Sequence, residues 1–447
     1  MRISLSDHFN YSRLLRFTLP SIAMVVFTSI YGVVDGFFVA NYAGKQAFAA
    51  VNLSYPVIMI LGTLGMMFGS GGSALVAAAQ GRGRKKLADE YFSLITYSAF
   101  VSGIVLVALS WYLLEPLMKL MGATDVLLED SVLYGHIMMI SLPAFILQSM
   151  FQILFITAGK PKLGFCVTAC AGVANMLLDF ILVGVLGYGL VGAGVATAVS
   201  EFFGGLVPLV YFFRNNGSSL QLIRTRWVPE ALFKTCFNGS SELLSGISSS
   251  FIGALYNYQL MKFVGENGVA AFGVVMYVTF IFFDIFVGYC NGVAPIISNH
   301  FGARDRDELR NLFRRCIVII GILGISLFTV AELSAPTLAY IFVGEDSDLF
   351  GMTKRACRIV SFCFLLSGFG IFGSSLFTAL NNGVLSAIIS VGRSVVFGTM
   401  AVMLLPLVFG VDGIWLAFWV TEVASIFVVA FFVIRKRKKY GYPNSTC

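Results

Sequence analysis

Twelve long apolar stretches, separated by short polar turns, run through the 447-residue sequence. Each is long enough to cross the hydrocarbon core of a bilayer as a helix, which takes about 20 residues. Only 12% of the residues are charged, whereas about 25% are charged in an ordinary soluble domain. The apolar runs are continuous and do not alternate as β-barrel strands do. The sequence therefore predicts an all-α integral membrane protein with twelve transmembrane helices.

The polar turns set the expected boundaries of these spans. The predicted spans are residues 14–40, 47–79, 91–113, 131–157, 163–186, 190–213, 232–261, 268–299, 313–333, 356–380, 384–409 and 413–434. An even number of spans places both termini on the same side of the membrane.

Lys and Arg are divided unequally between the two sides. Of the 30 basic residues, 23 lie on the side of the termini, 6 lie on the other side, and Arg393 lies inside a span. Cytoplasmic loops retain Lys and Arg, so we expect both termini in the cytoplasm. The expected location is the cell membrane, for a bacterium the inner membrane, with a multi-pass topology.

The two halves of the chain overlay when one is shifted by 221 residues. GKQAFAAVNLSYPV at 44–57 falls on GENGVAAFGVVMYV at 265–278, and GLVGAGVATAVSE at 189–201 falls on GVDGIWLAFWVTE at 410–422. Six spans return each half to the same side, so the repeat is parallel. Two six-helix lobes related in this way are typical of transporters with a cavity between the lobes.

The repeat also predicts how the chain is divided. We expect an N-terminal lobe at 1–213, a cytoplasmic linker at 214–230, a C-terminal lobe at 231–434 and a basic cytoplasmic tail at 435–447.

Several ionisable residues lie inside the predicted spans, where one charge costs at least about 2.5–3.5 kcal/mol. Asp35 lies deep in the first span, and Asp179 shares a helix face with Asn175, four residues earlier. Thr197 lies in the sixth span. Together these side chains supply oxygen ligands that can hold a proton or a small cation. The alternative is that each joins neighbouring helices through hydrogen bonds.

The repeat provides an internal control for these four residues. Their partners 221 positions later are Tyr256, Val396, Met400 and Phe418. Polar groups needed only to fold a six-helix lobe should occur in both lobes. We therefore predict a cation site in the N-terminal lobe alone.

Other polar residues in the spans have less specific interpretations. Glu201 keeps its repeat partner Glu422, which favours a structural role for both. Glu242 follows NGSS, so a role at the start of the seventh helix is one interpretation. Asp284 lies in the eighth span, and Arg393 is expected to pair with Glu422 or Glu242.

Proline residues interrupt several of the spans. Pro20 precedes Asp35 by 15 residues in the first span. A proline removes a backbone hydrogen bond and permits a bend. We expect a bend near Pro20 to be coupled to cation loading at Asp35.

Three segments, VDGFFVANYAG at 34–44, NMLLDFILV at 175–183 and GLVGAGVATAVSE at 189–201, resemble the multidrug and toxic compound extrusion family. The resemblance covers nearly the whole chain. It implies export of organic cations and drugs in exchange for inward Na⁺ or H⁺. In the branch of the family with a site in the N-terminal lobe, the cation ligands fall on Asp35, Asn175, Asp179 and Thr197.

The sequence departs from another branch of that family. There a carboxylate lies further into the seventh helix and an Asp lies on the tenth. Here Glu242 comes earlier, and the predicted tenth span at 356–380 contains no acidic residue. The resemblance therefore transfers no ion site to the C-terminal lobe.

These features predict a cation-coupled antiporter, driven by H⁺ or Na⁺, that exports organic cations or drugs by alternating access between two lobes. Expected partners are small cationic amphipathic molecules and the lipid bilayer, with no nucleic acid, and the expected state is a monomer. No cofactor is expected besides the coupling ion, and no metal besides Na⁺ at the four-residue set.

Two other classes of protein remain as alternatives. A lipid-linked oligosaccharide flippase of related fold needs a strongly cationic cavity, and Arg393 is the one basic residue deep inside a predicted span, away from its ends. An enzyme needs a nucleophile–base or metal motif, and neither HExxH nor G-x-S-x-G occurs in the sequence. We therefore expect no enzymatic activity.

Overall fold

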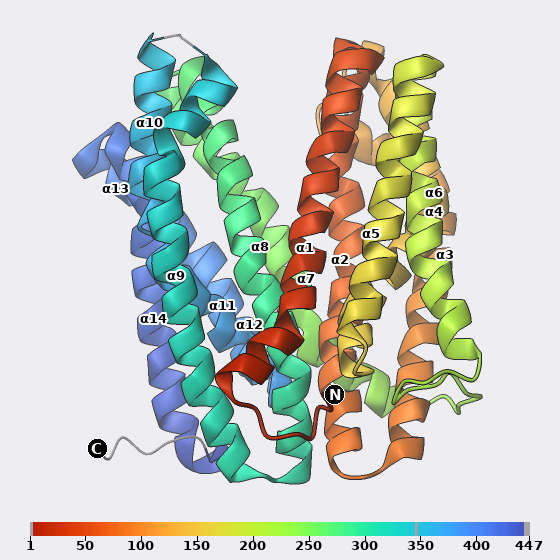
Figure 1. Ribbon diagram of the computed structural model, residues 1–447. Helices are drawn as coiled ribbons and strands as arrows, with labels where there is room; N and C mark the ends of the chain where they lie inside the picture. Colours follow the sequence, from red (N-terminus) through yellow and green to blue (C-terminus); the bar gives the residue numbers. More distant parts are fainter. Residues whose placement is uncertain (1–2, 345–346, 442–447) are drawn as a thin grey trace.

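The computed structural model describes residues 3–344 and 347–441, which are helical almost throughout. Figure 1 shows two upright bundles of helices, with no strand in the described ranges. The first half of the chain forms α1 (Tyr11–Phe38), η1 (Val39–Ala43), α2 (Lys45–Gly81), α3 (Lys85–Leu120), α4 (Asp125–Thr157), α5 (Pro161–Leu178), η2 (Asp179–Val185) and α6 (Gly189–Phe213). The second half forms α7 (Pro229–Phe263), α8 (Glu266–Ala303), α9 (Arg306–Val343), α10 (Ser347–Ser361), α11 (Phe364–Ala379), α12 (Gly383–Val391), η3 (Gly392–Phe397), α13 (Gly398–Phe409) and α14 (Val411–Tyr440).

The predicted membrane spans are all helical, in agreement with the all-α prediction. Within the described residues, ten continuous helical stretches are long and apolar enough to cross a membrane, and the pair α10 and α11 makes an eleventh. Helix α7 has the length for a twelfth, with 35 residues, but its many serines lower its hydropathy. The protein is therefore a multi-pass membrane protein.

One predicted span is wrong in its continuity. The stretch 356–380 is broken between α10 and α11, which meet at an angle of 50°. At the break the N–H of Cys363 bonds the carbonyl of Val360, three residues back, in a tighter turn than the α-helix allows. The run contains no Pro or Gly at this point, so nothing in the sequence marked the break.

The C-terminal end also differs from the simple expectation of a tail. Helix α14 continues through the basic residues of the predicted tail at 435–447 as far as Tyr440. Residues 442–447 of that tail lie outside the described residues.

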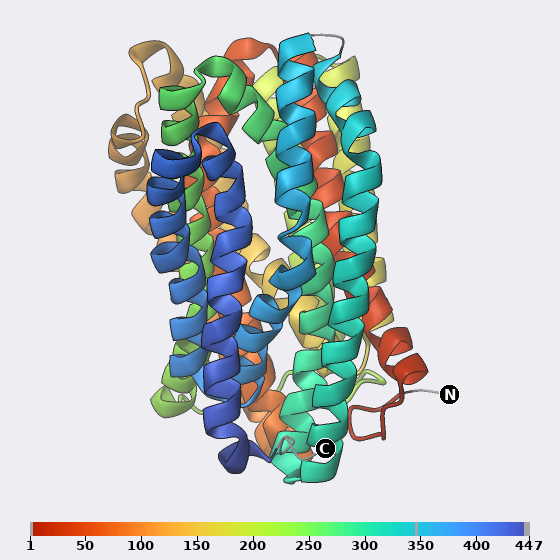
Figure 2. The same ribbon diagram turned by 90° about the vertical axis from the view of Figure 1, so that its left-hand side faces the viewer.

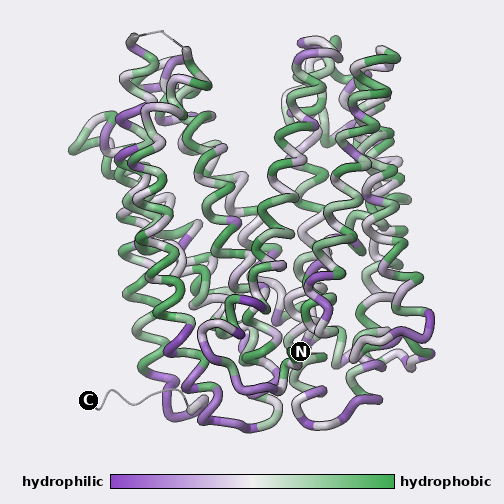
Figure 3. The backbone as a smooth tube through the Cα atoms, in the orientation of Figure 1, coloured by the Kyte–Doolittle hydropathy of each residue, from purple (hydrophilic) through white to green (hydrophobic). Residues whose placement is uncertain are grey.

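The described chain begins and ends at the same end of the two bundles, which we call the terminal end (Figures 1 and 2). Figure 3 shows hydrophilic residues gathered in the turns of this end and apolar residues along the helices. The long apolar shafts with polar ends are what a bilayer requires of spanning helices.

The repeat reappears in the backbone geometry. Gly44 and Gly265 are repeat partners, and they precede α2 and α8 with φ angles of 94° and 84°. These positive φ angles are disfavoured for residues with a Cβ, so glycine is required at both helix starts. The two halves therefore share local structure as well as sequence.

Helix α1 packs against both halves of the molecule. Phe9, Leu14 and Phe17, at its start, lie in the hydrophobic core formed mainly by α8–α14. Further along, Tyr31 packs against Gly172 of α5, where an added Cβ would lie 2.6 Å from the ring. Figure 1 shows α1 leaning from one bundle toward the other accordingly. Movement of α1 therefore affects both bundles.

Helix α7 mirrors this arrangement, as the repeat requires. Leu232 and Cys236 pack against the core of the first half, whereas Tyr256 and Leu260 lie in the core of the second. The two lobes thus exchange contacts through α1 and α7.

The lobes meet most closely near the terminal end. A Cβ on Gly81 of α2 would lie 1.9 Å from the carbonyl oxygen of Asn299, and one on Gly302 of α8 would lie 2.2 Å from that of Ala78. Gly81 and Gly302 are repeat partners, as are Ala78 and Asn299. This symmetric backbone crossing holds the terminal end together, while Figure 1 shows the bundles diverging toward the opposite end.

Candidate cation-binding site

Asp35, Asn175 and Thr197 come from three different helices and form a chain of hydrogen bonds. Thr197 Oγ1 on α6 donates to Asp35 Oδ1 on α1 at 3.5 Å. Asn175 Nδ2 on α5 donates to Thr197 Oγ1 at 3.4 Å. The structure therefore brings together three of the four residues predicted from the sequence, through bonds near the upper limit of length.

Asp179, the fourth residue, lies beside Asp35 at the first position of η2. Its side chain is fully buried, and neither of its carboxylate oxygens has a hydrogen-bond donor among the described residues. The carboxyl group of Asp35 lies within hydrogen-bonding reach of it. Ionised carboxylates only accept hydrogen bonds, so these two groups can bond each other only when one carries a proton.

The surroundings of this pair are rich in acceptors and poor in donors. Asn175 is buried, and its Oδ1 also lacks a donor within the described part of the chain. No ion pair joins Asp35 or Asp179 to a described Lys or Arg. Buried acceptors without donors are exceptional in proteins and need an account. A proton or a small cation between the carboxyl groups would satisfy them.

The π-helical segment η2 accounts for part of this placement. A π-helical turn contains an extra residue and shifts the direction of the side chains that follow. Such turns are frequent at functional sites. The segment starts at Asp179 and follows the α-helical turn that carries Asn175.

Glu201 and Glu422, repeat partners, have different surroundings. Arg393 Nη2 donates to Glu422 Oε1 at 2.6 Å, and Arg393 Nε lies 3.0 Å from both oxygens of Glu422. Glu422, and not Glu242, is thus the partner of Arg393. Glu201 has no such partner because the repeat position of Arg393 is Gly172.

Glu242 is not at the start of its helix. Helix α7 begins at Pro229, and the acidic residue in its first turn is Glu230. The interpretation of Glu242 as a helix-start residue is therefore wrong. The predicted span already began at residue 232, three residues after the helix itself, so the error came from taking NGSS as the start signal.

Asp284 lies on α8 and accepts a hydrogen bond from Ser29 of α1. This contact links the two lobes. Ser29 lies six residues before Asp35 on α1. Nothing in the sequence singles out Ser29, because a serine in an apolar helix usually bonds a carbonyl of its own helix.

Pro20 lies inside α1, which continues as a helix on both sides of it. It lies within the part of α1, from Leu14 to Met24, that packs in the core of the second half, and the segment that carries Asp35 follows.

Comparison with known proteins agrees with this architecture. The profile of the MatE family matches residues 20–181 and 243–403, one match in each half. The chain is 23% identical over 412 residues to the multidrug export protein MepA of Staphylococcus saprophyticus, which covers 91% of this chain and 88% of that protein.

Two solved structures have the same fold. A crystal structure of MATE in complex with MaL6 has a TM-score of 0.90 and 22% identity, over 96% of this chain and 97% of that chain. An outward-facing multidrug resistance MATE family transporter of the MOP superfamily has a TM-score of 0.91 and 22% identity, over 97% of both chains. Since the family profile covers both halves, the chain belongs to the MatE family of multidrug and toxic compound extrusion transporters.

Proposed function

We propose that the protein is a cation-coupled antiporter that exports small organic cations or drugs in exchange for H⁺ or Na⁺. The observation that supports this most strongly is the adjacent pair of carboxyl groups of half-buried Asp35 and fully buried Asp179, because no described residue donates a hydrogen bond to Asp179. Intramembrane acidic residues of this kind mark ion pathways and proton relays.

Cation loading acts in this proposal through α1. A proton or Na⁺ between Asp35 and Asp179 removes the repulsion of two carboxylates and draws α1 toward α5. Asn175 and Thr197 then serve as neutral ligands. Release of the cation restores the repulsion and frees α1 to move.

The same helix carries the movement to the other lobe. Ser29 on α1 bonds Asp284 on α8, so a shift of α1 at Asp35 changes the contact between lobes. Pro20 leaves the carbonyl of Arg16 without its helical donor, which makes this part of α1 the place where a bend is easiest. Export is coupled to cation entry when cation and substrate favour different states of the lobes.

The names of the relatives support the substrate class. MepA of Staphylococcus saprophyticus, which aligns with 91% of this chain, is a multidrug export protein. We infer that the substrates of this protein are likewise small amphipathic molecules. Cationic substrates are favoured because acidic side chains of both lobes attract positive charge. The transporter acts as a monomer in this proposal.

We assign the terminal end to the cytoplasm. Most Lys and Arg residues lie in the turns of that end, as cytoplasmic loops require. The glycine crossing of α2 and α8 closes this side, so the structure corresponds to a state with access from outside the cell.

The flippase alternative lacks the cationic cavity that it needs. Among the described residues, Arg393 is the basic residue that lies away from the ends of the spans, and it is neutralised by Glu422. A pyrophosphate group would therefore meet no unpaired cation in the described interior of the spans.

The proposal is tested by efflux of a fluorescent organic cation such as ethidium from membrane vesicles. Asp35→Asn and Asp179→Asn should each reduce gradient-driven transport to the level of vesicles without the protein, while the variants remain folded. Glu129→Gln, which removes an exposed carboxylate at the far end of α4, should transport as the parent does. Normal transport by Asp35→Asn would refute the site.

A further inference from the structure

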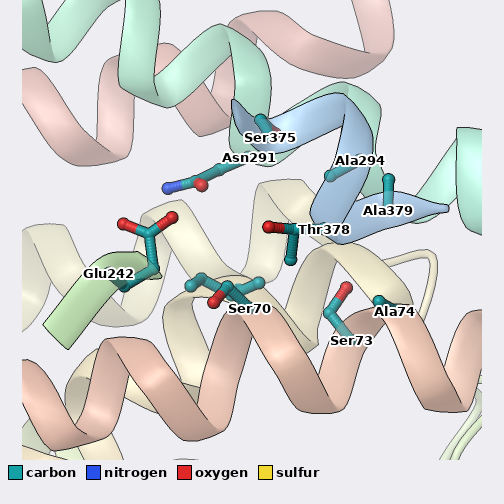
Figure 4. Close-up of a pocket in the computed structure, with 10 residues that line it drawn as sticks. Ser70, Ser73, Ala74, Glu242, Asn291, Ala294, Ser375, Thr378 and Ala379 are labelled. Carbon is teal, nitrogen blue, oxygen red and sulfur yellow. The ribbon is translucent and has the colours of Figure 1, made fainter. Parts of the chain in front are cut away.

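A second polar cluster surrounds a small cavity between the lobes (Figure 4). The cavity has a volume of about 10 Å³, close to the minimum that one water molecule requires. Its polar lining includes Ser70 of α2, Glu242 of α7, Asn291 of α8, and Ser375 and Thr378 of α11. Figure 4 shows the side chains of Glu242 and Asn291 extending toward each other, with Ser70 beside them.

The carboxylate of Glu242 has no cationic partner. No described Lys, Arg or His forms an ion pair with it. The acidic member of each ion pair among the described residues is a residue other than Glu242. Among the described residues, the thiol of Cys290 on α8 lies near enough to interact electrostatically with it. Facing residues on α2 and α11 are hydroxyls. An unpaired carboxylate so placed within the membrane needs a counter-charge.

The oxygens around Glu242 are available as ligands. Ser70 Oγ is buried and has no hydrogen-bond partner among the described residues. Thr378 Oγ1 lies 2.7 Å from Ser386 Oγ and keeps a lone pair free for the cavity when it donates. The lining thus offers one negative charge and several neutral oxygens.

Residues of both lobes line this cavity, and the backbones of α2 and α7 pack in close contact beside it. A Cβ on Gly71 of α2 would lie 2.1 Å from the carbonyl oxygen of Thr235, and one on Gly239 of α7 would lie 2.0 Å from that of Met67. These crossings leave no room for the helices to approach further. Glu242, one turn beyond Gly239, is therefore enclosed when the terminal end is closed.

The cavity is separate from the Asp35 set. Glu242 lies 13 residues along α7 from the terminal end, or about 20 Å at 1.5 Å per residue. Asp35 lies 24 residues along α1 from the same end, or about 36 Å. The Asp35 set is built from α1, α5 and α6, whereas this cavity is built from α2, α7, α8 and α11.

We propose that this cavity binds one small monovalent cation, Na⁺ or hydronium, between Glu242 of one lobe and Ser70 of the other. A single carboxylate is balanced by a single positive charge, and hydroxyl and amide oxygens are the ligands that hard cations prefer. The bound cation links α2 to α7 and stabilises the closed terminal end. When it leaves, the negative charge of Glu242 favours separation of the lobes and entry of water.

This inference goes beyond the proposed transport site, so its test does not measure transport. Hydrogen–deuterium exchange is followed in peptides covering 66–82 and 288–304, at the α2–α8 crossing, in Na⁺ or in N-methylglucamine at equal ionic strength. The Asp35→Asn variant serves as the background, so that the other site contributes no response. A second series varies pH without Na⁺, with exchange corrected for intrinsic rates.

The expected result is slower exchange at the crossing when the cation is bound, by up to about tenfold at ten times its dissociation constant. Glu242→Gln should abolish the response, and Ser70→Ala, which keeps the charge and removes the ligand of the other lobe, should weaken it. Glu129→Gln should leave it unchanged. A response to Na⁺ identifies a sodium site, and one confined to acid pH identifies hydronium.

Either response must depend on Glu242. Equal exchange with and without cation, or a response that survives in Glu242→Gln, overturns the proposal. Because the assay uses the Asp35→Asn background, its failure leaves the transport site untouched, and failure of the transport site leaves this result standing.

Discussion

Glu201 and Glu422 occupy equivalent positions in the two lobes but differ in what lies beside them. Glu422 is neutralised by Arg393, through a pair that is buried on the glutamate side. Glu201 is also buried, and its Oε2 has no described partner. Sequence equivalence therefore does not mean chemical equivalence. The C-terminal lobe has an internal ion pair where the N-terminal lobe has uncompensated carboxyl groups.

The Arg393–Glu422 pair predicts a large effect of single substitutions on stability. Glu422→Gln leaves Arg393 without its counter-charge and should lower the free energy of unfolding by about 3–5 kcal/mol. The double variant Arg393→Met with Glu422→Met should recover most of that loss, because no charge remains buried. Denaturant unfolding in detergent measures both.

A matched control comes from the exposed pair Arg355 and Asp412. Asp412→Asn should cost less than about 1 kcal/mol, as surface pairs do. A Glu422→Gln variant as stable as Asp412→Asn would contradict a structural role for the buried pair.

At this scale the sequence singled out the four residues that the structure brings together, but not all of their surroundings. The repeat isolated Asp35, Asn175, Asp179 and Thr197 because their partners are apolar or aromatic. It could not identify the Ser29–Asp284 contact or the cavity at Glu242. Those depend on which faces of distant helices meet, and single serines are too common in spans to carry a signal.

The elements that join the lobes are α1, α2, α7 and α8. Helix α7 packs in both hydrophobic cores, and α1 packs in the core of the second half and against Gly172 of α5, while α2 and α8 cross at the paired glycines Gly81 and Gly302. The apolar runs predicted the spans well, since bilayer thickness sets their length. They did not predict the bend between α10 and α11, since hydropathy alone does not mark it.

The glycine crossing predicts that a small side chain there opens the terminal end. Gly302→Ala places a Cβ 2.2 Å from the backbone oxygen of Ala78, which cannot move without shifting α2. Spin labels at Arg84 and Asp307, in a background without native cysteines, should then lie further apart than in the parent. Gly36→Ala, whose Cβ would meet nothing within 4 Å, should leave the distance unchanged.

An unchanged distance in Gly302→Ala would contradict this prediction. It would mean that the two helices part without altering the terminal end, and that the close backbone approach does not hold the lobes closed.

At the scale of the whole molecule, two repeats with one fold carry different polar groups. The N-terminal lobe holds the acidic pair, the C-terminal lobe holds the internal ion pair, and α1 contacts both. An antiporter of the proposed kind needs such a division, because the cation and the substrate must favour different conformational states of the same two lobes.

The central claim is that cation and substrate are transported in opposite directions and that this coupling requires Asp35 and Asp179. The most direct test reconstitutes the protein in liposomes and applies a gradient of ethidium alone, with internal H⁺ and Na⁺ followed by a pH dye and by ²²Na⁺. The account predicts that ethidium flux drives one of these cations the opposite way, and that Asp35→Asn abolishes the cation movement. Ethidium flux with no opposing cation movement, or cation movement that persists in Asp35→Asn, would contradict it.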